Sequence, residues 1–499
     1  MNKLFSTTVF LLISIVALKA SPKNIIEADT QSKITYTISI DQHNPKIARV
    51  QLSFIPQDSL LYMTQGAGQF PDRWATFIHH LEVINAEGKV IAIKDLPDAQ
   101  WILPYTPKEE IKVSYEVRLD HDQHQWGGGL DGVAYTTDWG VFYAGRALLV
   151  FNGADWEDIR VNFSLPDRWK ASTPWERAGE NSFQVHNQMS LMQSMIFAGT
   201  HEEVTISEGD FELIFALGGE QVLAEREEFK NLAGGVLDYY VELMDGLPNP
   251  PPGQVLDRCL VIINSSDSTD GEVIGSSISI LIEKDGDQMA KMISRFVFAH
   301  EFFHLWNGKS FMPDDSETEW FKEGFSNYYT LKALHHVGFL NDQAYFGVLN
   351  NLFYQRYASD SGIGNLAMIR GEEKHAHWGL IYGGGLFVAL AQDIMIRETT
   401  RNTKSVDDLM RKFFKRYGGT HDHYVIDDLK ETLDELNGKD QSQFFQHYIQ
   451  GTKILPIADY LGRAGLDARI EENALKISNK EDISSLQKAI IGAMLGDLD

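Results

Sequence analysis

The chain has 499 residues, and its 70 acidic against 44 basic side chains give a formal net charge of −26. A chain of this length is expected to form two to four domains with sizeable cores. Its negative charge repels phosphate backbones and anionic lipid, so we expect no nucleic-acid partner and interpret the charge as a contribution to solubility.

The N-terminus has the pattern of an export signal. Lys3 precedes an apolar, uncharged run over residues 4–18, and Ala20 offers a small-residue cleavage point. The run is shorter than the ~20 residues that a membrane-spanning helix needs. We therefore expect a signal peptide over residues 1–20, a periplasmic or secreted protein, and no stable membrane anchor after cleavage.

Residues 21–205 are predicted to form an N-terminal β domain. Apolar and polar residues alternate with period two in residues 33–40, 48–55 and 111–119, and turn-rich stretches separate these runs. Such alternation is typical of half-buried strands. The pattern favours an all-β sandwich.

Beyond residue 205 the pattern becomes mainly helical. The stretch over residues 226–247 predicts a helix that is ended by Gly246 and the proline cluster PNPPPG. Ser405 and Asp408 form a capping pair at the start of a later helix. We assign residues 206–460 to a second domain and residues 461–499 to a short C-terminal tail, because the tail is too short for another ordinary domain.

The stretch HEFFH over residues 300–304 carries the clearest chemical signal. His300 and His304 lie one helical turn apart and so project from the same face. Two imidazoles at this spacing are able to bind one Zn²⁺, and Glu301 is able to reach a water on that metal. By itself the pattern also arises by chance, and helical histidines are often simply packed.

A catalytic zinc site needs a third protein ligand and one position left open for water. Glu323 is the candidate, because it stands among aromatic residues where a buried carboxylate is costly unless a cation compensates it. Ser316 and Glu319 form a capping-box pattern, which predicts a helix from about residue 317 to about Gly338. An exposed glutamate on a solvated face is the alternative interpretation.

Two asparagines are candidates for supporting the ligands. Asn327 lies one turn after Glu323 on the same helical face and is placed to accept a hydrogen bond from the free nitrogen of a ligand histidine. Asn307 lies three residues beyond His304. Both positions are also compatible with ordinary surface residues.

The ligand spacing resembles that of a known family. Eighteen residues separate His304 from Glu323, which is the signature of gluzincin metallopeptidases. HEFFHLWNGKS and EWFKEGFSNYY together resemble the M61 family, the glycyl aminopeptidases, and the resemblance extends over about residues 30–460. It implies a multidomain α+β protein in which an all-β sandwich precedes a thermolysin-like, mainly helical zinc peptidase domain.

The resemblance implies two further site residues. Tyr382, in HWGLIYGGGLF, matches the tyrosine that donates to the oxyanion in related gluzincins, and the glycines after it are expected to let the backbone approach the substrate. Glu272 stands near the place of a glutamate in a GGLEH-like strand that helps to hold the substrate, and is able to bind an α-ammonium group. This chain departs from that strand, which leaves strict aminopeptidase specificity open.

Many members of the M61 family also carry a C-terminal PDZ-like domain. Only about 40 residues follow residue 456 in this chain. These are fewer than a typical domain requires, so we expect no complete PDZ domain.

These observations predict an exported zinc metallopeptidase that hydrolyses peptides. One Zn²⁺ is expected on His300, His304 and Glu323, with Glu301 as general base. The resemblance implies release of a small N-terminal residue such as Gly or Ala. Endopeptidase action, a peptide-binding pseudo-peptidase without turnover, and a structural metal site remain alternatives, and the sequence specifies neither natural substrate nor oligomeric state.

Overall fold

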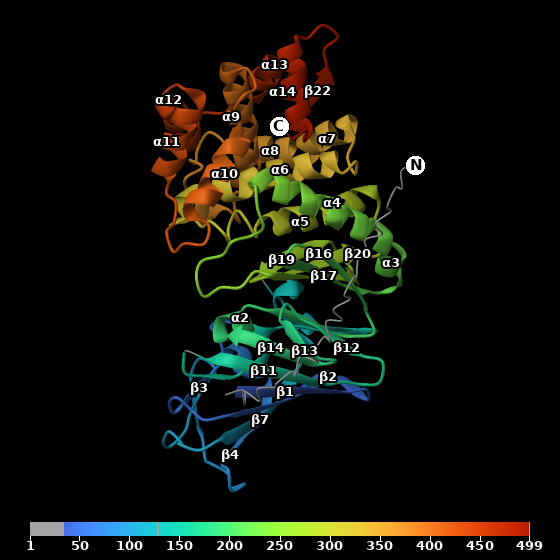
Figure 1. Cartoon of the computed structure of the whole chain (residues 1–499), viewed down its shortest axis with the longest axis vertical. Helices are drawn as coiled ribbons and strands as arrows, with labels where there is room; N and C mark the ends of the chain where they lie inside the picture. The colour runs from blue at the N-terminus through green and yellow to red at the C-terminus, as the bar shows by residue number, and fades with distance from the viewer. Residues whose placement is uncertain (1–33, 127–128, 155, 499) are drawn as a thin grey trace, which may run out of the picture. The chain divides into compact units, whose positions relative to one another are not determined.

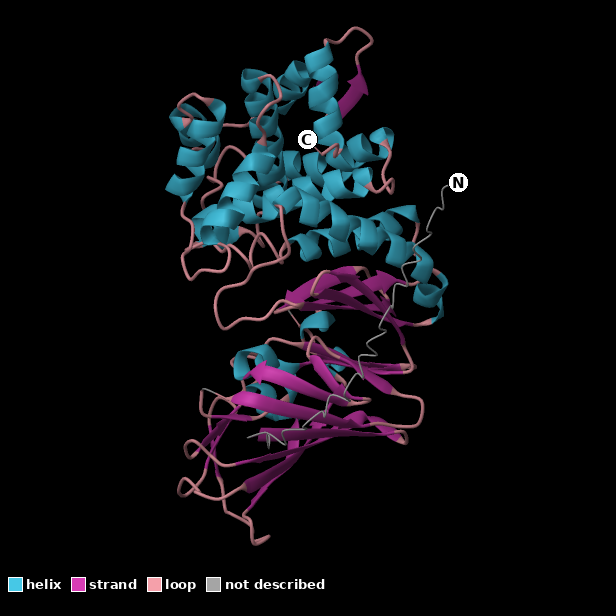
Figure 2. Cartoon of the chain, in the orientation of Figure 1, coloured by secondary structure: helices cyan, strands magenta, loops and turns pink. Residues whose placement is uncertain are grey.

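A computed structural model describes residues 34–126, 129–154 and 156–498. The predicted signal peptide lies outside the described residues. Strands dominate the first part of the chain and helices the later part (Figure 2). The predicted α+β organisation, with a β-rich domain before a mainly helical one, is therefore confirmed.

The largest sheet of the N-terminal domain has seven strands in the order β13-β14-β11-β1-β2-β7-β4. The runs that alternate in the sequence are its central strands, and they bury alternate side chains as predicted. Its strands are β1 (Ile34–Asp41), β2 (Asn44–Phe54), β4 (Ile78–Ile84), β7 (Ile111–Arg118), β11 (Glu157–Ser164), β13 (Glu176–Gly179) and β14 (Ser182–Asn187).

Two four-stranded sheets complete this domain, in the orders β10-β3-β6-β5 and β12-β15-β9-β8. One hydrophobic core joins all three sheets, with Val50, Leu61 and Tyr143 as members from each. The further elements are β3 (Leu60–Tyr62), β5 (Lys94–Leu96), β6 (Gln100–Ile102), β8 (Ala134–Thr137), β9 (Gly140–Ala144), α1 (Gly145–Leu148), β10 (Phe151–Asn152), β12 (Lys170–Ser172), α2 (Gln188–Met192) and β15 (Met195–Gly199).

A five-stranded sheet begins the second domain, in the order β16-β17-β18-β20-β19. Strands β17, β18 and β20 are parallel, and the edge strands β16 and β19 are antiparallel to their neighbours. The predicted boundary between residues 205 and 206 falls inside β16. The strands are β16 (Glu202–Glu208), β17 (Phe211–Gly218), β18 (Arg258–Ser266), β19 (Asp270–Ile274) and β20 (Ser277–Glu283).

Both faces of this five-stranded sheet are buried. Phe215 points toward helices α4 (Arg226–Met244) and α5 (Gln288–Phe303), whereas its neighbour Ile214 points toward Phe142 and Phe197 of the N-terminal domain. Burial on both faces explains why β18 reads as an almost continuous apolar run. Cys259, a free cysteine, lies buried in that strand.

Helices make up most of the remaining chain (Figure 1). Helix α4 and the capping box of Ser405 and Asp408 are confirmed. The helices are α3 (Glu220–Ala224), α4 (Arg226–Met244), α5 (Gln288–Phe303), α6 (Glu319–His336), α7 (Asp342–Val348), α8 (Gln355–Ser359), α9 (Gly384–Thr400), α10 (Val406–Tyr417), α11 (Ile426–Asn437), α12 (Ser442–Phe444), α13 (Ile457–Ala464) and α14 (Ser485–Leu495).

The predicted C-terminal tail is folded onto the helical domain. Its boundary at residue 460 falls inside α13, and a hairpin of β21 (Leu466–Glu471) and β22 (Ala474–Asn479) follows before α14. Tyr345 Oη donates to the carbonyl of Met494 at 3.0 Å, and Met494 is fully buried. Residues 461–498 are thus an integral part of the helical domain.

The start of α6 differs from the prediction. A 3₁₀ turn over Ser316–Thr318 precedes the helix, and the Asp315 side chain caps that turn by accepting from the Glu317 amide at 2.8 Å. The predicted capping box from Ser316 is therefore wrong. Aspartate caps as well as serine does, and Asp315 stands one residue earlier, where the chain is still extended.

Helix α6 is held by buried charges at its C-terminal half. Lys332 Nζ and Arg397 Nη2 both bind the Asp407 carboxylate, at 2.9 and 3.1 Å, and all three side chains are inaccessible to solvent. Burial by itself raises the pKa of Asp407, but Lys332 and Arg397 outweigh it and lower the pKa to about 2. This network joins α6 to α9 and α10.

Glycines bring α6 and α9 together at the other end. A Cβ atom on Gly324 would clash with the backbone of Gly385, and one on Gly385 would lie 3.0 Å from the Cα of Gly324. The glycines after Tyr382 were expected to let the backbone approach a substrate, and for Gly385 this is wrong. It lets two helices approach each other beside Glu323 instead.

The described residues contain one helical stretch that is long and apolar enough to cross a membrane, Gly379–Thr400. Within the protein, 89% of its most apolar window is buried. A buried core helix has the same composition, so the stretch is accounted for by packing against α6.

We expect Gly324→Ala to lower the free energy of unfolding by about 1–3 kcal/mol, because the added methyl group has no space between the helices. Gly234→Ala is the matched control. Nothing lies within 4 Å of a Cβ atom at Gly234 in α4, so this change should be neutral or stabilise by about 0.5–1 kcal/mol. Chemical denaturation measures both, and equal effects would contradict the close helix contact.

Candidate metal centre

Helix α5 carries the two histidines of the HEFFH stretch. Its first turn is capped by Asp287, whose side chain accepts from the amides of Met289 and Ala290 at 2.9 and 3.0 Å. His300 lies in the last turn, and His304 is the residue that ends the helix. The two Nε2 atoms are 3.1 Å apart, so the predicted convergence of these imidazoles is present.

Helix α6 brings Glu323 to the same point. Its Oε2 atom lies 3.4 Å from His300 Nε2 and 3.3 Å from His304 Nε2. The three side chains are largely buried, with exposed fractions of 8%, 12% and 6% for His300, His304 and Glu323. The structure thus brings together the three predicted metal ligands from two helices.

These distances fit a metal ion. Ligands about 2.0–2.1 Å from a tetrahedral zinc ion stand about 3.3–3.4 Å apart, close to the separations of the three donor atoms. His304 Nδ1 lies 2.8 Å from the carbonyl oxygen of Asn307, which only accepts hydrogen bonds. Nδ1 therefore carries the proton, and the lone pair of Nε2 faces the site. The donor set is able to hold one divalent cation.

The two predicted supporting asparagines lie next to the candidate ligands, but the partner of Asn327 differs from the predicted one. Asn327 Nδ2 donates to the carbonyl of Tyr382 at 3.4 Å, so Asn327 ties α6 to the turn that carries Tyr382. Asn307 orients His304 through its backbone oxygen, while its side chain donates to the carbonyl of Lys322 at 3.1 Å. His300 Nδ1 is buried and has no hydrogen-bond partner among the described residues.

A cavity of about 310 Å³ opens over the three ligands. Glu301 and Tyr382 both line it, together with the ligands themselves. Tyr382 lies in a π-helical turn over Gly379–Gly383, before α9, and its ring stacks on Trp378 with the centroids 5.2 Å apart. The remaining lining residues are Gly271, Glu272, Val273, Gly308, Lys309 and Lys322.

Burial changes the proton affinity of the groups in this cavity. It raises the pKa of Glu301 to about 7, and the attraction of His300 opposes that rise. Burial and the nearby Glu323 carboxylate raise the pKa of Tyr382. Tyr382 is therefore a protonated hydroxyl at neutral pH, and Glu301 exchanges a proton readily.

The pattern of the sequence did not predict the cations behind Glu323. Lys374 Nζ lies 3.1 Å from Glu323 Oε1 and 2.6 Å from Glu319 Oε2, while Lys322 Nζ lies 2.7 Å from Glu319 Oε1. The contact with Lys374 occupies Oε1 of Glu323, while Oε2 faces the two imidazoles. Lys374 lies in a polar loop with no periodicity, so only its place in the fold identifies it.

Glu272, which the sequence analysis named as a candidate substrate contact, lies on the edge strand β19 and lines the cavity. Its Oε1 accepts from Arg146 Nη2 at 3.0 Å, and the same Arg146 nitrogen donates to the carbonyl of Gly132 at 2.8 Å. Burial raises the pKa of Glu272, and Arg146 opposes the rise. Arg146 therefore binds one oxygen of this carboxylate at the cavity wall.

Two family models match this chain. Residues 35–200 match the Peptidase M61 N-terminal domain, and residues 294–368 match the M61 glycyl aminopeptidase. Both parts of the chain thus match models of M61 peptidase domains, which supports a peptidase. The second match contains His300, Glu301, His304 and Glu323, so the candidate metal centre lies inside the matched segment.

A solved structure shares the fold. It is an aminopeptidase N family protein from Idiomarina loihiensis, with a TM-score of 0.73 and 17% sequence identity. The similarity covers 88% of this chain and 79% of that chain. Among curated protein sequences, none matches the chain.

We expect Lys374→Met to destabilise the metal-free protein by about 1–3 kcal/mol, because it removes one of the two lysines that bind the buried Glu319 and Glu323 carboxylates and leaves only Lys322. Added Zn²⁺ should reverse part of the loss by compensating Glu323. Denaturation with and without Zn²⁺ measures both effects.

Lys412→Met is the matched control. Lys412 pairs with Glu435 on the surface at 2.6 Å, and such pairs contribute about 0–1 kcal/mol. A Lys374→Met protein as stable as this control without metal would contradict the assigned role.

Proposed function

We propose that this protein is an M61 peptidase, a zinc-dependent aminopeptidase that removes small N-terminal residues such as Gly or Ala from peptides. The observation that carries the proposal is the placement of three donor atoms 3.1–3.4 Å apart beside Glu301 in one cavity. A structural zinc site usually has four protein ligands. Here three ligands face an open cavity, which favours catalysis.

A zinc ion on His300, His304 and Glu323 would polarise the scissile carbonyl and lower the pKa of a bound water. Glu301 accepts a proton from the attacking water and returns it to the nitrogen of the leaving amine as the C–N bond breaks. Tyr382, held protonated by burial and by Glu323, donates a hydrogen bond to the oxygen that develops negative charge.

Glu272 supports the aminopeptidase assignment. Its carboxylate lines the cavity beside Glu301, and Arg146 binds one of its two oxygens. The other oxygen remains able to bind the α-ammonium group of a peptide. An endopeptidase would not use this contact. Cleavage at internal peptide bonds is therefore the outcome that would argue most directly against the aminopeptidase proposal.

We expect Glu301→Gln to lower kcat/KM for peptide hydrolysis by about 10²–10⁴-fold, because glutamine cannot accept the water's proton. Bound zinc should be retained, since Glu301 is not one of the converging ligands. Hydrolysis of an N-terminally varied peptide library by the zinc-loaded protein, read by mass spectrometry, measures the loss and locates the cuts.

Glu283→Gln is the matched control, because Glu283 is exposed at the end of β20 and lies outside the cavity. A wild-type protein that binds zinc and peptides but cleaves none would replace the proposal with a peptide-binding pseudo-peptidase. Cuts only at internal bonds would replace it with an endopeptidase.

We further propose that the chain is exported, on the strength of its first 20 residues alone. Mature protein from the periplasm or medium should begin at Ser21. Intact-mass measurement tests this, and a chain that retains Met1 in the cytoplasm would contradict it.

A further inference from the structure

The charges that line the metal cavity are mostly paired. Arg146 binds Glu272, Lys374 binds Glu323, and Lys322 binds Glu319. Lys309 is different: in the part of the chain that the structure describes, no carboxylate lies within ion-pair distance of its ammonium group. An unpaired cation in a partly buried place is costly, unless a ligand supplies the missing anion.

The position of Lys309 is fixed by the turn that follows α5. Gly308 has φ +135°, a conformation that favours glycine, and its amide donates to the carbonyl of Phe311 at 3.0 Å. Ser310 Oγ donates to the carbonyl of Leu305 at 2.7 Å. The same turn orients His304 through the Asn307 carbonyl. The turn therefore holds the backbone of Lys309 at a defined position relative to the candidate metal ligands.

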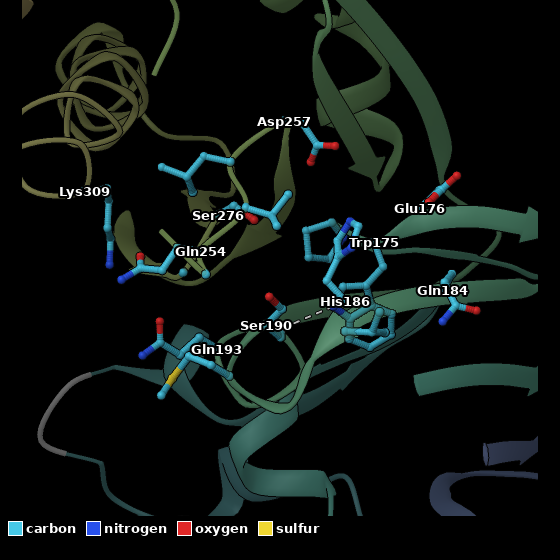
Figure 3. Close-up of a pocket in the computed structure, with 17 residues that line it drawn as sticks. Trp175, Glu176, Gln184, His186, Ser190, Gln193, Gln254, Asp257, Ser276 and Lys309 are labelled. Carbon is cyan, nitrogen blue, oxygen red and sulfur yellow. Dashed lines mark hydrogen bonds between the residues drawn. The ribbon is translucent and has the colours of Figure 1, made fainter. Parts of the chain in front are cut away.

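Lys309 also lines a second pocket, which extends from the turn to the N-terminal domain. Figure 3 shows its side chain on the same side of this pocket as the amide groups of Gln193 and Gln254. Trp175 and Leu256 are buried lining residues of the pocket. Lys309 thus lines both the metal cavity and an adjoining pocket with an apolar component.

We propose that Lys309, with the amides of Gln193 and Gln254, binds a carboxylate of the substrate beyond the scissile bond, and that this carboxylate is the free C-terminus of a short peptide. The proposal rests on the proposed peptidase function and names its substrate class. A short peptide carries an ammonium group at one end and a carboxylate at the other. Glu272 and Lys309 offer complementary charges to these ends.

Burial and repulsion by Lys322 lower the pKa of Lys309, and Glu301 opposes this. A bound carboxylate compensates the ammonium group and forms a charge-assisted hydrogen bond with it. Neutral amides beside it supply further donors without adding charge.

The test compares peptides of two, three and four alanines, each as the free acid and as the C-terminal amide. For the zinc-loaded wild type we expect kcat/KM for the best free acid to exceed that of its amide by about 10-fold or more. Lys309→Met should bring this ratio close to one, and Lys309→Arg should preserve most of it.

Lys284→Met is the matched control. Lys284 lines a different cavity, formed with Trp139 and Ser265, so this change removes a lysine without touching the metal cavity. For this variant, the ratio of kcat/KM for the free acid to kcat/KM for the amide should equal that of the wild type.

A second set of substrates consists of amidated peptides with Glu or Gln after the first residue, because an acidic side chain is the other source of a carboxylate.

Equal rates for acid and amide at every length in the wild type would overturn the proposal, even if Lys309→Met does not fold. If the rates differ only between the amidated peptides that contain Glu and those that contain Gln, the bound carboxylate is a side chain and not the C-terminus, which would overturn this part of the proposal. Calorimetric binding of the same peptides to zinc-loaded Glu301→Gln separates the two proposals. If the free acids bind more tightly than the amides but the wild type hydrolyses neither, the peptidase proposal is rejected. If the wild type hydrolyses the peptides but free acids and amides behave alike, the carboxylate site is rejected.

Discussion

Three electron-pair donors converge inside this protein, and a cation bound between them would offset their mutual repulsion. His300, His304 and Glu323 place their donor atoms 3.1–3.4 Å apart, largely out of contact with water. Without a compensating cation such an arrangement is costly. The packing around α5 and α6 serves to hold these groups at distances that suit a metal ion.

Two kinds of force hold that arrangement. Close packing dominates near Glu323, where Gly324 and Gly385 let α6 and α9 approach each other. Charge dominates further along α6, where Lys332 and Arg397 surround Asp407. Lys374 completes the arrangement by binding Oε1 of Glu323. Its contact directs Oε2 of the same carboxylate toward the two histidines.

The N-terminal domain forms its own hydrophobic core and also contacts a residue that lines the metal cavity. Strand β9 has both faces buried, with Tyr143 in the N-terminal core and Phe142 against the five-stranded sheet. Arg146, which follows this strand, reaches Glu272 at the cavity wall. A domain boundary drawn from composition alone misses this contact, because it joins residues 126 positions apart.

The sequence by itself determined the features that depend on local periodicity. The spacing of His300 and His304 places them on one helical face, and the alternation of the early strands determines which side chains are buried. Glu323 was recognised from its spacing and its aromatic neighbours. These signals are local, so they survive without knowledge of the tertiary structure.

Only the tertiary structure decided which distant groups surround the metal centre. Lys374 and Lys309 lie in irregular segments, and Arg146 belongs to the other domain, so no repeating pattern marks them. Gly385 and the side chain of Asn327 have different partners from those expected, because packing between α6 and α9 sets their surroundings. Periodicity determines which face a residue occupies, whereas its partner depends on how the whole chain packs.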